Sequence, residues 1–443
     1  MAGGMEEGDA AGVQRRRAMT VTASHRIYGL AAIMFAALLT CARIPRGVGS
    51  PPYLITLAIA GVAYLLAIRE FFATPRFPRR VIVIGLALAA LWHLPFLLMP
   101  AGADDDVHRY VWDGRLQRLG FNPYIVVPND PAFRALHTDE TRNLNNPEVA
   151  SPYPAGAQLF FRAVTAIHES AFAFKGAFVL CELAIVPLLL AELRRLGQAE
   201  HWVLAYAWNP LLVTCVTYSG HVDILGVLLL LLSVAALGRR WRTFAAIAFG
   251  LAVAVKFLPI VLAPLYWRRV RVRDALLAVV VVVLLYVPFL RGGSVPTGSI
   301  GVFVQRFRFN DPVFAEIERI VSPRVVAGFA LLLGLLTAAV LRRRQDENSP
   351  QAFAWPMAAS LLCAPVVYPW YLLWLLPFVR SVSTVPLIIW TISILPTFYV
   401  WHLRTLGREW VVPGWIVLLE YGTVAAAAII ELRRIRRSTS VAA

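Results

Sequence analysis

The sequence has few of the features that mark a soluble enzyme. Charged residues make up 15% of its 443 residues, and Lys175 and Lys256 are the only lysines among 42 basic residues. The four cysteines lie in separate apolar segments without a CxxC spacing, which favours small core residues over a zinc site or a disulfide framework. No Walker A motif and no GxGxxG after a predicted strand is present, so the sequence does not indicate a nucleotide-binding domain.

Hydrophobic residues are abundant instead. They make up 59% of the chain, and its mean hydropathy of +0.65 is typical of a protein with many membrane spans. The net charge of +16 could indicate a nucleic-acid partner, but the arginines form short groups between apolar runs rather than one basic face. We therefore predict an all-α polytopic membrane protein whose arginines set its topology and which binds no nucleic acid.

Apolar runs long enough to cross a bilayer occur at about twelve places. They fall at about 27–42, 52–68, 81–100, 171–193, 202–219, 222–237, 243–267, 275–290, 325–341, 353–379, 383–400 and 413–431. Two of them are interrupted, at 256–259 and at 365–370. We expect each interrupted run to form two short helices that meet near the outer face, because broken helices are tolerated where protein or water covers the backbone. The prediction is a bundle of about 12–14 membrane segments.

Arginine groups between the apolar runs predict the orientation. By the positive-inside rule, the groups within 69–80, 194–195, 239–242, 268–273, 342–344 and 433–437 are cytoplasmic. This topology predicts a multi-pass protein of the cell membrane with both termini cytoplasmic and the polar loop 101–170 extracytoplasmic. It divides the chain into a disordered cytoplasmic tail (1–24), one transmembrane domain (25–432) and a basic cytoplasmic tail (433–443).

The polar loop opens on three adjacent carboxylates, Asp104, Asp105 and Asp106. Neighbouring carboxylates repel one another, which leaves one of them poised to accept a proton if a cation or a cleft holds them together. The alternative is an acidic start to the next helix, because Asp is favoured at the N-cap and in the first turn. The residues that follow are amphipathic and predict a helix in the membrane interface, closed by Gly120.

Other polar residues converge on the outer face in this topology. His221 and Asp223 stand at a predicted helix start, where such a pair can bind a metal, cap the helix or hold a phosphate or a sugar hydroxyl. Lys256 lies between apolar halves, so its ammonium needs an anion such as a lipid phosphate or must reach the interface. Tyr368 belongs to an aromatic and proline break, a composition also common in interfacial belts.

Several motifs together, in this order, resemble the multi-spanning polyprenyl-phosphate-sugar-dependent glycosyltransferases of the GT-C superfamily, in particular bacterial mannosyltransferase-like members. The resemblance covers about 104–378 and rests on segments 105–115, 120–124, 145–158, 208–211, 219–223, 256–259 and 365–371.

This resemblance implies a GT-C-type bundle whose first large extracytoplasmic loop carries the general base, Asp105 or Asp106. The base would deprotonate an acceptor hydroxyl while that oxygen displaces the lipid phosphate and inverts the anomeric carbon. The substrate-binding candidates are Asp104, Arg109, Tyr110, Asp113, Asn122, Tyr124, Tyr153, Gln158, His221, Asp223, Lys256 and Tyr368. Arg109, His221 and Lys256 are the candidates for the donor phosphate.

The implied reaction is hexosyl transfer, with mannose as the first choice of sugar, to a cell-envelope glycan or glycolipid. We expect no cofactor, and we favour metal independence although the aspartates could hold a divalent ion. A transporter or flippase of a lipid-linked sugar is the alternative, because it also needs many spans and broken helices. It would predict two similar halves, and no clear repeat is present in the sequence.

Overall fold

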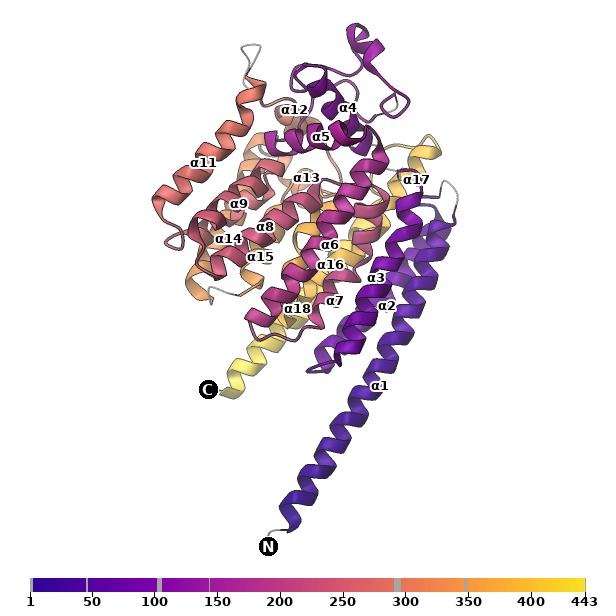
Figure 1. The fold of residues 1–443 in the computed structure, drawn as a ribbon, viewed down its shortest axis with the longest axis vertical. Helices are drawn as coiled ribbons and strands as arrows, with labels where there is room; N and C mark the ends of the chain where they lie inside the picture. Colours follow the sequence, from indigo (N-terminus) through magenta and orange to yellow (C-terminus); the bar gives the residue numbers. More distant parts are fainter. Residues whose placement is uncertain are drawn as a thin grey trace.

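The structure is a computed structural model that describes residues 3–44, 47–101, 106–142, 144–290, 296–345 and 349–442. The regular secondary structure of the described residues is helical, apart from an isolated pairing of Phe309 with Val366. Figure 1 shows long helices arranged side by side, with short helices gathered over one end of the bundle and both chain termini at the other end. The predicted all-α architecture is thereby confirmed.

Eight helices in the described residues are long and apolar enough to cross a membrane, or nine if a bent pair forms one span. Their bounds are α1 (Gly3–Ala42, spanning part Thr20–Ala42), α2 (Pro51–Ala73), α3 (Arg79–Leu98), α6 (Ala171–Arg195), α11 with η4 (Val272–Phe289), α14 (Pro323–Arg344), the segment Val382–Thr405 that contains α16 (Val385–Ser393) and α17 (Tyr399–Thr405), and α18 (Gly414–Ala442). Helices α1 and α18 continue through the residues predicted to form the two tails.

The remaining apolar runs form short or bent helices. They are α7 (Trp202–Ala207), η2 (Leu212–Tyr218), α8 (Asp223–Gly238), α9 (Arg242–Val255), η3 (Leu258–Leu262), α10 (Ala263–Tyr266), α15 (Gln351–Leu362), η5 (Pro369–Trp374) and η6 (Leu376–Phe378). Helices η2 and α8 meet at 114°. The predicted breaks at 256–259 and 365–370 are both confirmed. The described residues contain fewer continuous spans than the 12–14 predicted membrane segments, because these remaining apolar runs are divided into short helices.

Proline explains where the runs divide, since it lacks a backbone N–H and clashes with the preceding helical turn. Pro259 follows Lys256 at the end of α9, and Pro365 and Pro369 flank the second break. The backbone freed there is paired: Phe309 N donates to the Pro365 carbonyl at 3.2 Å, and Val367 N donates to the Phe309 carbonyl at 2.8 Å. The segment around Phe309 thus pairs with the backbone of the second break, as is required of broken helices in membrane proteins.

The polar loop contains α4 (Asp106–Arg118), η1 (Pro131–Leu136) and α5 (Ala155–Ile167), while α12 (Ile300–Arg306) and α13 (Pro312–Glu318) follow α11. Gly120 ends α4 in the left-handed region at φ 86°, as predicted for a helix C-cap. Gly114 lets α4 approach α5 closely, because a Cβ there would lie 2.4 Å from the Phe161 carbonyl oxygen. Most α4 side chains are buried within the protein, so more of this helix is covered than its amphipathic pattern predicts.

Candidate active site

Asp106 is the described member of the predicted catalytic carboxylates, and it begins α4. Its Oδ1 accepts a hydrogen bond of 2.5 Å from Asn145 Nδ2, and its Oδ2 lies 3.7 Å from His221 Nδ1. The side chain is 18% exposed, so the carboxylate is held in place and still reachable. Asp104 and Asp105 lie outside the described residues.

His221 reaches Asp106 because of the sharp bend between η2 and α8. Gly220 makes this bend at φ 74°, a conformation that glycine adopts without the steric cost of a Cβ. A Cβ at Gly220 would lie 3.2 Å from Lys175 Cγ and 3.3 Å from Val107 Cγ2. Both the backbone angle and the crowding therefore favour glycine beside the histidine.

Aromatic rings continue the site from His221 into the second broken segment. The His221 ring stacks on Trp370 with centroids 3.7 Å apart, and Trp370 stacks on Tyr368 at 4.3 Å. Phe309 then packs against Tyr368 at 4.4 Å. Stacking on one face fixes the orientation of an imidazole ring, whose nitrogens lie at the ring edge.

Lys256 stands at the break after α9, and its ammonium is paired. Its Nζ donates to Asp223 Oδ2 at 2.8 Å and lies 4.0 Å from the centre of the Tyr371 ring. The buried Asp223 also accepts a hydrogen bond of 2.7 Å from Trp374 Nε1. The Lys256 side chain is 21% exposed, so a ligand phosphate can approach it while Asp223 compensates its charge.

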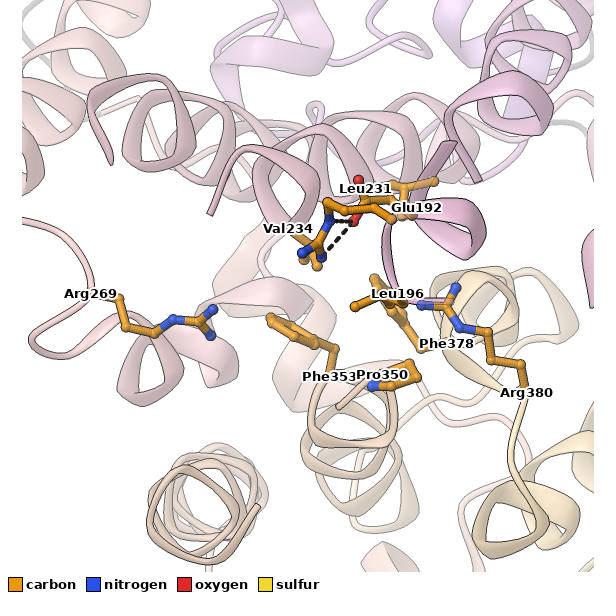
Figure 2. A pocket seen from close by; sticks show the side chains of 10 residues that line it. Glu192, Leu196, Leu231, Val234, Arg269, Pro350, Phe353, Phe378 and Arg380 are labelled. Atoms are coloured by element: carbon orange, nitrogen blue, oxygen red, sulfur yellow. Dashed lines mark hydrogen bonds and ion pairs between the residues drawn. The ribbon is translucent and has the colours of Figure 1, made fainter. Parts of the chain in front are cut away.

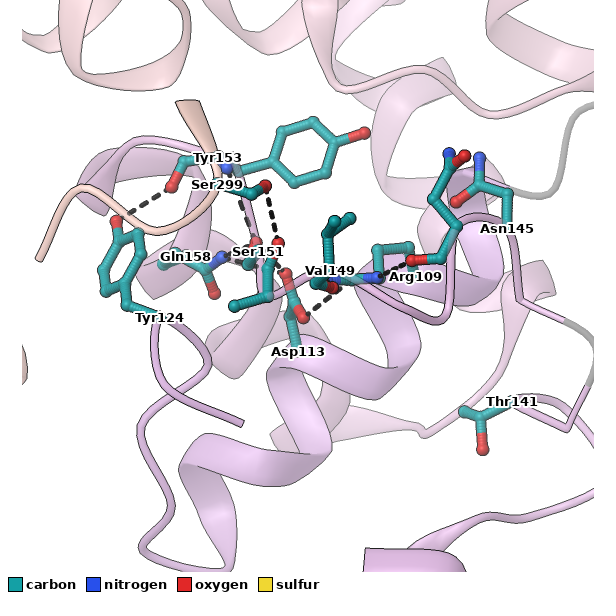
Figure 3. Close-up of polar contacts among 12 residues, drawn as sticks. Arg109, Asp113, Tyr124, Thr141, Asn145, Val149, Ser151, Tyr153, Gln158 and Ser299 are labelled. Carbon is teal, nitrogen blue, oxygen red and sulfur yellow. Dashed lines mark hydrogen bonds and ion pairs between the residues drawn. The ribbon is translucent and has the colours of Figure 1, made fainter. Parts of the chain in front are cut away.

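Arg109 and Asp113 form a buried pair that fastens α4 to the segment after it (Figure 3). Arg109 Nε lies 3.3 Å from Asp113 Oδ1, and Arg109 Nη2 donates to the Val149 carbonyl at 2.6 Å. Asp113 Oδ2 accepts hydrogen bonds from Ser151 and, at 2.9 Å, from Gln158 Nε2. Burial raises the pKa of the Asp113 carboxyl, and the Arg109 charge and these hydrogen bonds oppose that rise.

Four other predicted site residues also make contacts within the loop region. Asn122 Nδ2 donates to the Phe289 carbonyl at 2.9 Å, and Tyr124 Oη donates to the Tyr153 carbonyl at 2.8 Å. The buried Tyr110 ring stacks on Phe161 at 4.5 Å. The Tyr153 ring is half-buried and packs edge-on against Tyr110 at 5.1 Å. A role in substrate binding stays a prediction for all four.

The structure therefore joins Asp106, His221, Asp223, Lys256 and Tyr368 through direct or one-residue contacts, from segments far apart in sequence. It places Arg109, Asp113 and Gln158 in a separate internal network.

The sequence-based prediction missed Asn145 and Trp374, which hydrogen-bond the two site carboxylates. Asn145 lies in 145–158, one of the segments that carry the family resemblance, so its side-chain amide could have been predicted as a site residue. For Trp374 the sequence offers only its closeness to the predicted break at 365–370.

Among the described residues, no group of three or more histidine, cysteine, aspartate or glutamate side chains is arranged to hold a metal ion. Asp104 and Asp105 are not part of that set.

The comparisons with known proteins concern the class of protein. The model of a family described as "Alpha-(1->6)-mannopyranosyltransferase, N-terminal domain" matches residues 33–270, which is more than half of the chain. The match and the all-helical bundle define a glycosyltransferase of the integral-membrane class. The chain belongs to the MptA_B family of alpha-(1->6)-mannopyranosyltransferases. The predicted resemblance to mannosyltransferase-like membrane enzymes is confirmed, and the transferase is favoured over the transporter alternative.

The chain also matches a solved structure, that of ArnT from Cupriavidus metallidurans bound to undecaprenyl phosphate. The alignment covers 79% of this chain and 74% of that chain, with 13% sequence identity and a TM-score of 0.45. No curated protein matched the chain.

Proposed function

We propose that the protein transfers a mannosyl group from a polyprenyl-phosphate donor to a cell-envelope glycan or glycolipid, forming an α-(1→6) linkage on the outer face of the membrane. Membership of the mannopyranosyltransferase family is the observation that carries the sugar and the linkage. The many apolar helices and the lack of a nucleotide-binding motif support a donor carried by lipid.

Asp106, or Asp105 next to it in the chain, is the proposed general base. The carboxylate takes the proton of the acceptor hydroxyl, whose oxygen bonds to the anomeric carbon. The bond from that carbon to the phosphate oxygen breaks, and polyprenyl phosphate leaves with the electron pair. One displacement inverts the anomeric carbon, so an α-linked product requires a β-linked donor. Asn145 supports this assignment because its amide fixes one Asp106 oxygen and leaves the other toward His221.

Lys256 and His221 are the proposed contacts for the donor phosphate. An ammonium aimed at the leaving phosphate stabilises the charge that develops there. Asp223 holds Lys256 in place before the donor arrives, because its buried carboxylate accepts a hydrogen bond from the ammonium. Trp374 in turn holds that carboxylate through a second hydrogen bond. Tyr368 contributes a wall of the site through its stack with Trp370.

We assign four of the other predicted residues to the support and acceptor side of the site. Arg109, Asp113 and Gln158 position the loop, because their contacts are with one another and with the loop backbone. Tyr153 is the candidate for an acceptor contact, since its ring is half-buried beside α4.

The test uses the purified full-length protein in liposomes, a synthetic polyprenyl-phosphate-β-mannose and octyl α-mannoside as the acceptor. We expect a dimannoside with an α-(1→6) linkage, identified by NMR, and no product from the α-linked donor. Asp106→Asn should slow transfer by about 10²–10⁴-fold, the range for loss of a general base.

Asp139→Asn is the matched control because Asp139 lies on the same loop and is 95% exposed. Full transfer by both Asp105→Asn and Asp106→Asn in folded protein would refute the base assignment. If no lipid-linked mannose is consumed, the proposed donor is wrong.

A further inference from the structure

Lys175 is one of two lysines in the chain, and it is not among the site residues described above. It lies in the second turn of α6, where the residue is 1% exposed. A buried ammonium is costly unless polar groups replace the water that it loses. Here backbone carbonyls of another helix do so, and they link Lys175 to the end of α3.

The ammonium of Lys175 caps the C-terminal end of α3. Its Nζ donates to the Phe96 carbonyl at 2.8 Å and to the Met99 carbonyl at 2.7 Å. Because α3 ends at Leu98, both carbonyls lie where a helix end lacks intrahelical partners. The helix dipole also favours a cation at this end. The side chain thus fixes the point at which the chain leaves α3 and enters the polar loop.

The methylene stem of Lys175 packs where α4 meets the turn at Gly220. A Cβ on Gly220 would lie 3.2 Å from Lys175 Cγ and 3.3 Å from Val107 Cγ2, so both side chains lie against this glycine. Val107 follows Asp106 in the chain, and Gly220 precedes His221. Lys175 therefore lies at the junction of the two segments that carry Asp106 and His221, whose side chains are 3.7 Å apart.

A second layer of polar contacts joins the same helices further along α6. Glu182 lies on the same face of α6 as Lys175, and its Oε1 is 3.2 Å from His93 Nε2 in α3. The other His93 nitrogen hydrogen-bonds the Thr217 hydroxyl in η2. Pro95 separates this layer from the end of α3 and removes a helix hydrogen bond there. Loss of the Lys175 ammonium should therefore loosen the end of α3 without detaching the helix.

We propose that Lys175 is a positioning residue for sugar transfer, which holds the start of the polar loop against the turn that carries His221. This role rests on the proposed function, because Asp106 and His221 are its proposed base and donor-phosphate contact. The hydrogen bonds of the Lys175 ammonium go to backbone carbonyls, so it acts by setting the place of these two groups. A misplacement of about 1 Å between reacting groups can slow a reaction by about 10²-fold.

The kinetic test uses the full-length protein in liposomes with the synthetic polyprenyl-phosphate-β-mannose and octyl α-mannoside. We expect Lys175→Met, which keeps an apolar stem and loses the ammonium, to lower kcat by about 10–100-fold with little change in donor KM. An unchanged kcat in folded protein would overturn the proposal. A raised donor KM alongside that unchanged kcat would assign Lys175 to substrate binding instead.

Amide hydrogen exchange without substrate tests the contacts independently of transfer. We expect Lys175→Met to raise exchange at 96–101, 107–111 and 219–223, because these segments meet at Lys175. Unchanged exchange in all three segments would overturn the proposal even if transfer is slow. If the wild type consumes no lipid-linked mannose while exchange rises in the variant, the proposed function fails and the contact role of Lys175 is upheld.

Arg239→Met is the matched control. Figure 2 shows the surroundings of Glu192, near the C-terminal end of α6. Arg239 pairs with Glu192 there and donates to the Ala235 carbonyl of α8 at 2.9 Å. This variant also loses a cation that joins α6 to a neighbouring helix end, but at the end of α6 away from Lys175. Its kcat and its exchange in the three segments should equal those of the wild type, and a response as large as that of Lys175→Met would overturn the proposal.

Lys175→Gln keeps the test valid if Lys175→Met does not fold. Its amide leaves a hydrogen-bond donor near the carbonyls of Phe96 and Met99, while its side chain is shorter than that of lysine. We expect the same fall in kcat and the same three segments to exchange faster, both to a smaller extent than in Lys175→Met. Wild-type kcat and wild-type exchange in this variant would count against the proposal in the same way.

Discussion

Replacing Asp223 with asparagine removes the charge opposite Lys256 and keeps an oxygen for Trp374 Nε1. The two charged atoms are 2.8 Å apart, Asp223 is fully buried, and Lys256 is 21% exposed. At an effective dielectric constant of about 20, their attraction is about 6 kcal/mol, and the cost of desolvating both groups offsets several kcal/mol of it. We expect Asp223→Asn to lower the free energy of unfolding by about 2–4 kcal/mol, because it leaves an ammonium without its carboxylate.

The assay is a double-mutant cycle with Asp223→Asn and Lys256→Met, using denaturant unfolding in detergent followed by tryptophan fluorescence. We expect a coupling free energy of about 2 kcal/mol between the two sites. The control pair is Arg319 with Glu316, which has a similar separation of 2.7 Å but is 71% and 64% exposed. Its coupling should be below about 1 kcal/mol. Equal coupling in the two cycles would refute the view that Asp223 holds Lys256.

Three further predictions concern other parts of the molecule. Gly220→Ala should destabilise the protein by about 1–2 kcal/mol through its left-handed φ of 74° and should also slow transfer by moving His221, which thermal unfolding and a transfer assay can separate. Asn145→Ala should slow transfer roughly tenfold with little change in donor KM, because Asp106 loses one oriented hydrogen bond; an unchanged rate would mean that Asn145 does not position the base. Burial raises the pKa of Asp311 from 3.8 to about 6. Between these pH values the folded state therefore binds more protons than the unfolded state. The free energy of unfolding should fall by at most about 3 kcal/mol as the pH rises from 3.8 to about 6. Asp311→Asn should flatten that pH dependence, and an unaltered slope would contradict the assignment.

The sequence carried enough information to locate the helix breaks because proline and buried charge leave few alternatives. Lys256 before Pro259 marks a place where a helix cannot continue and an ammonium needs a partner, and the structure breaks α9 there. Gly120 was equally predictable, since a left-handed helix end favours glycine. These signals are local, so a single stretch of sequence is sufficient to read them.

The roles of polar side chains within the loop were less predictable because they depend on contacts between distant residues. Arg109 and Asp113 are predicted to bind substrate, and in the structure they contact each other and the segment 146–158. An arginine that binds a phosphate and an arginine that fastens a loop have the same sequence signal. The contacts with Val149 and Ser151 support the proposed positioning role, and they could not be predicted because they join α4 to a segment more than 35 residues further along the chain.

The candidate site also includes residues beyond the part of the chain that matches the family, 33–270. Asp106, His221, Asp223 and Lys256 lie within the match, but the rings of Trp370 and Trp374 that hold His221 and Asp223 lie after it.

The C-terminal helix contacts the segment that packs on Tyr368, the ring stacked on Trp370. Glu420 in α18 accepts hydrogen bonds from Trp390 Nε1 at 2.6 Å and from Asn310 Nδ2 at 3.1 Å, and Asn310 adopts a left-handed φ of 53°. This contact fixes the loop in which Phe309 pairs with Val366 and packs on Tyr368. Glu420→Gln should therefore disturb the stack of His221 on Trp370 and slow transfer, although Glu420 lies outside the matched region. If the active site is complete within 33–270, this variant should transfer at the rate of the wild type.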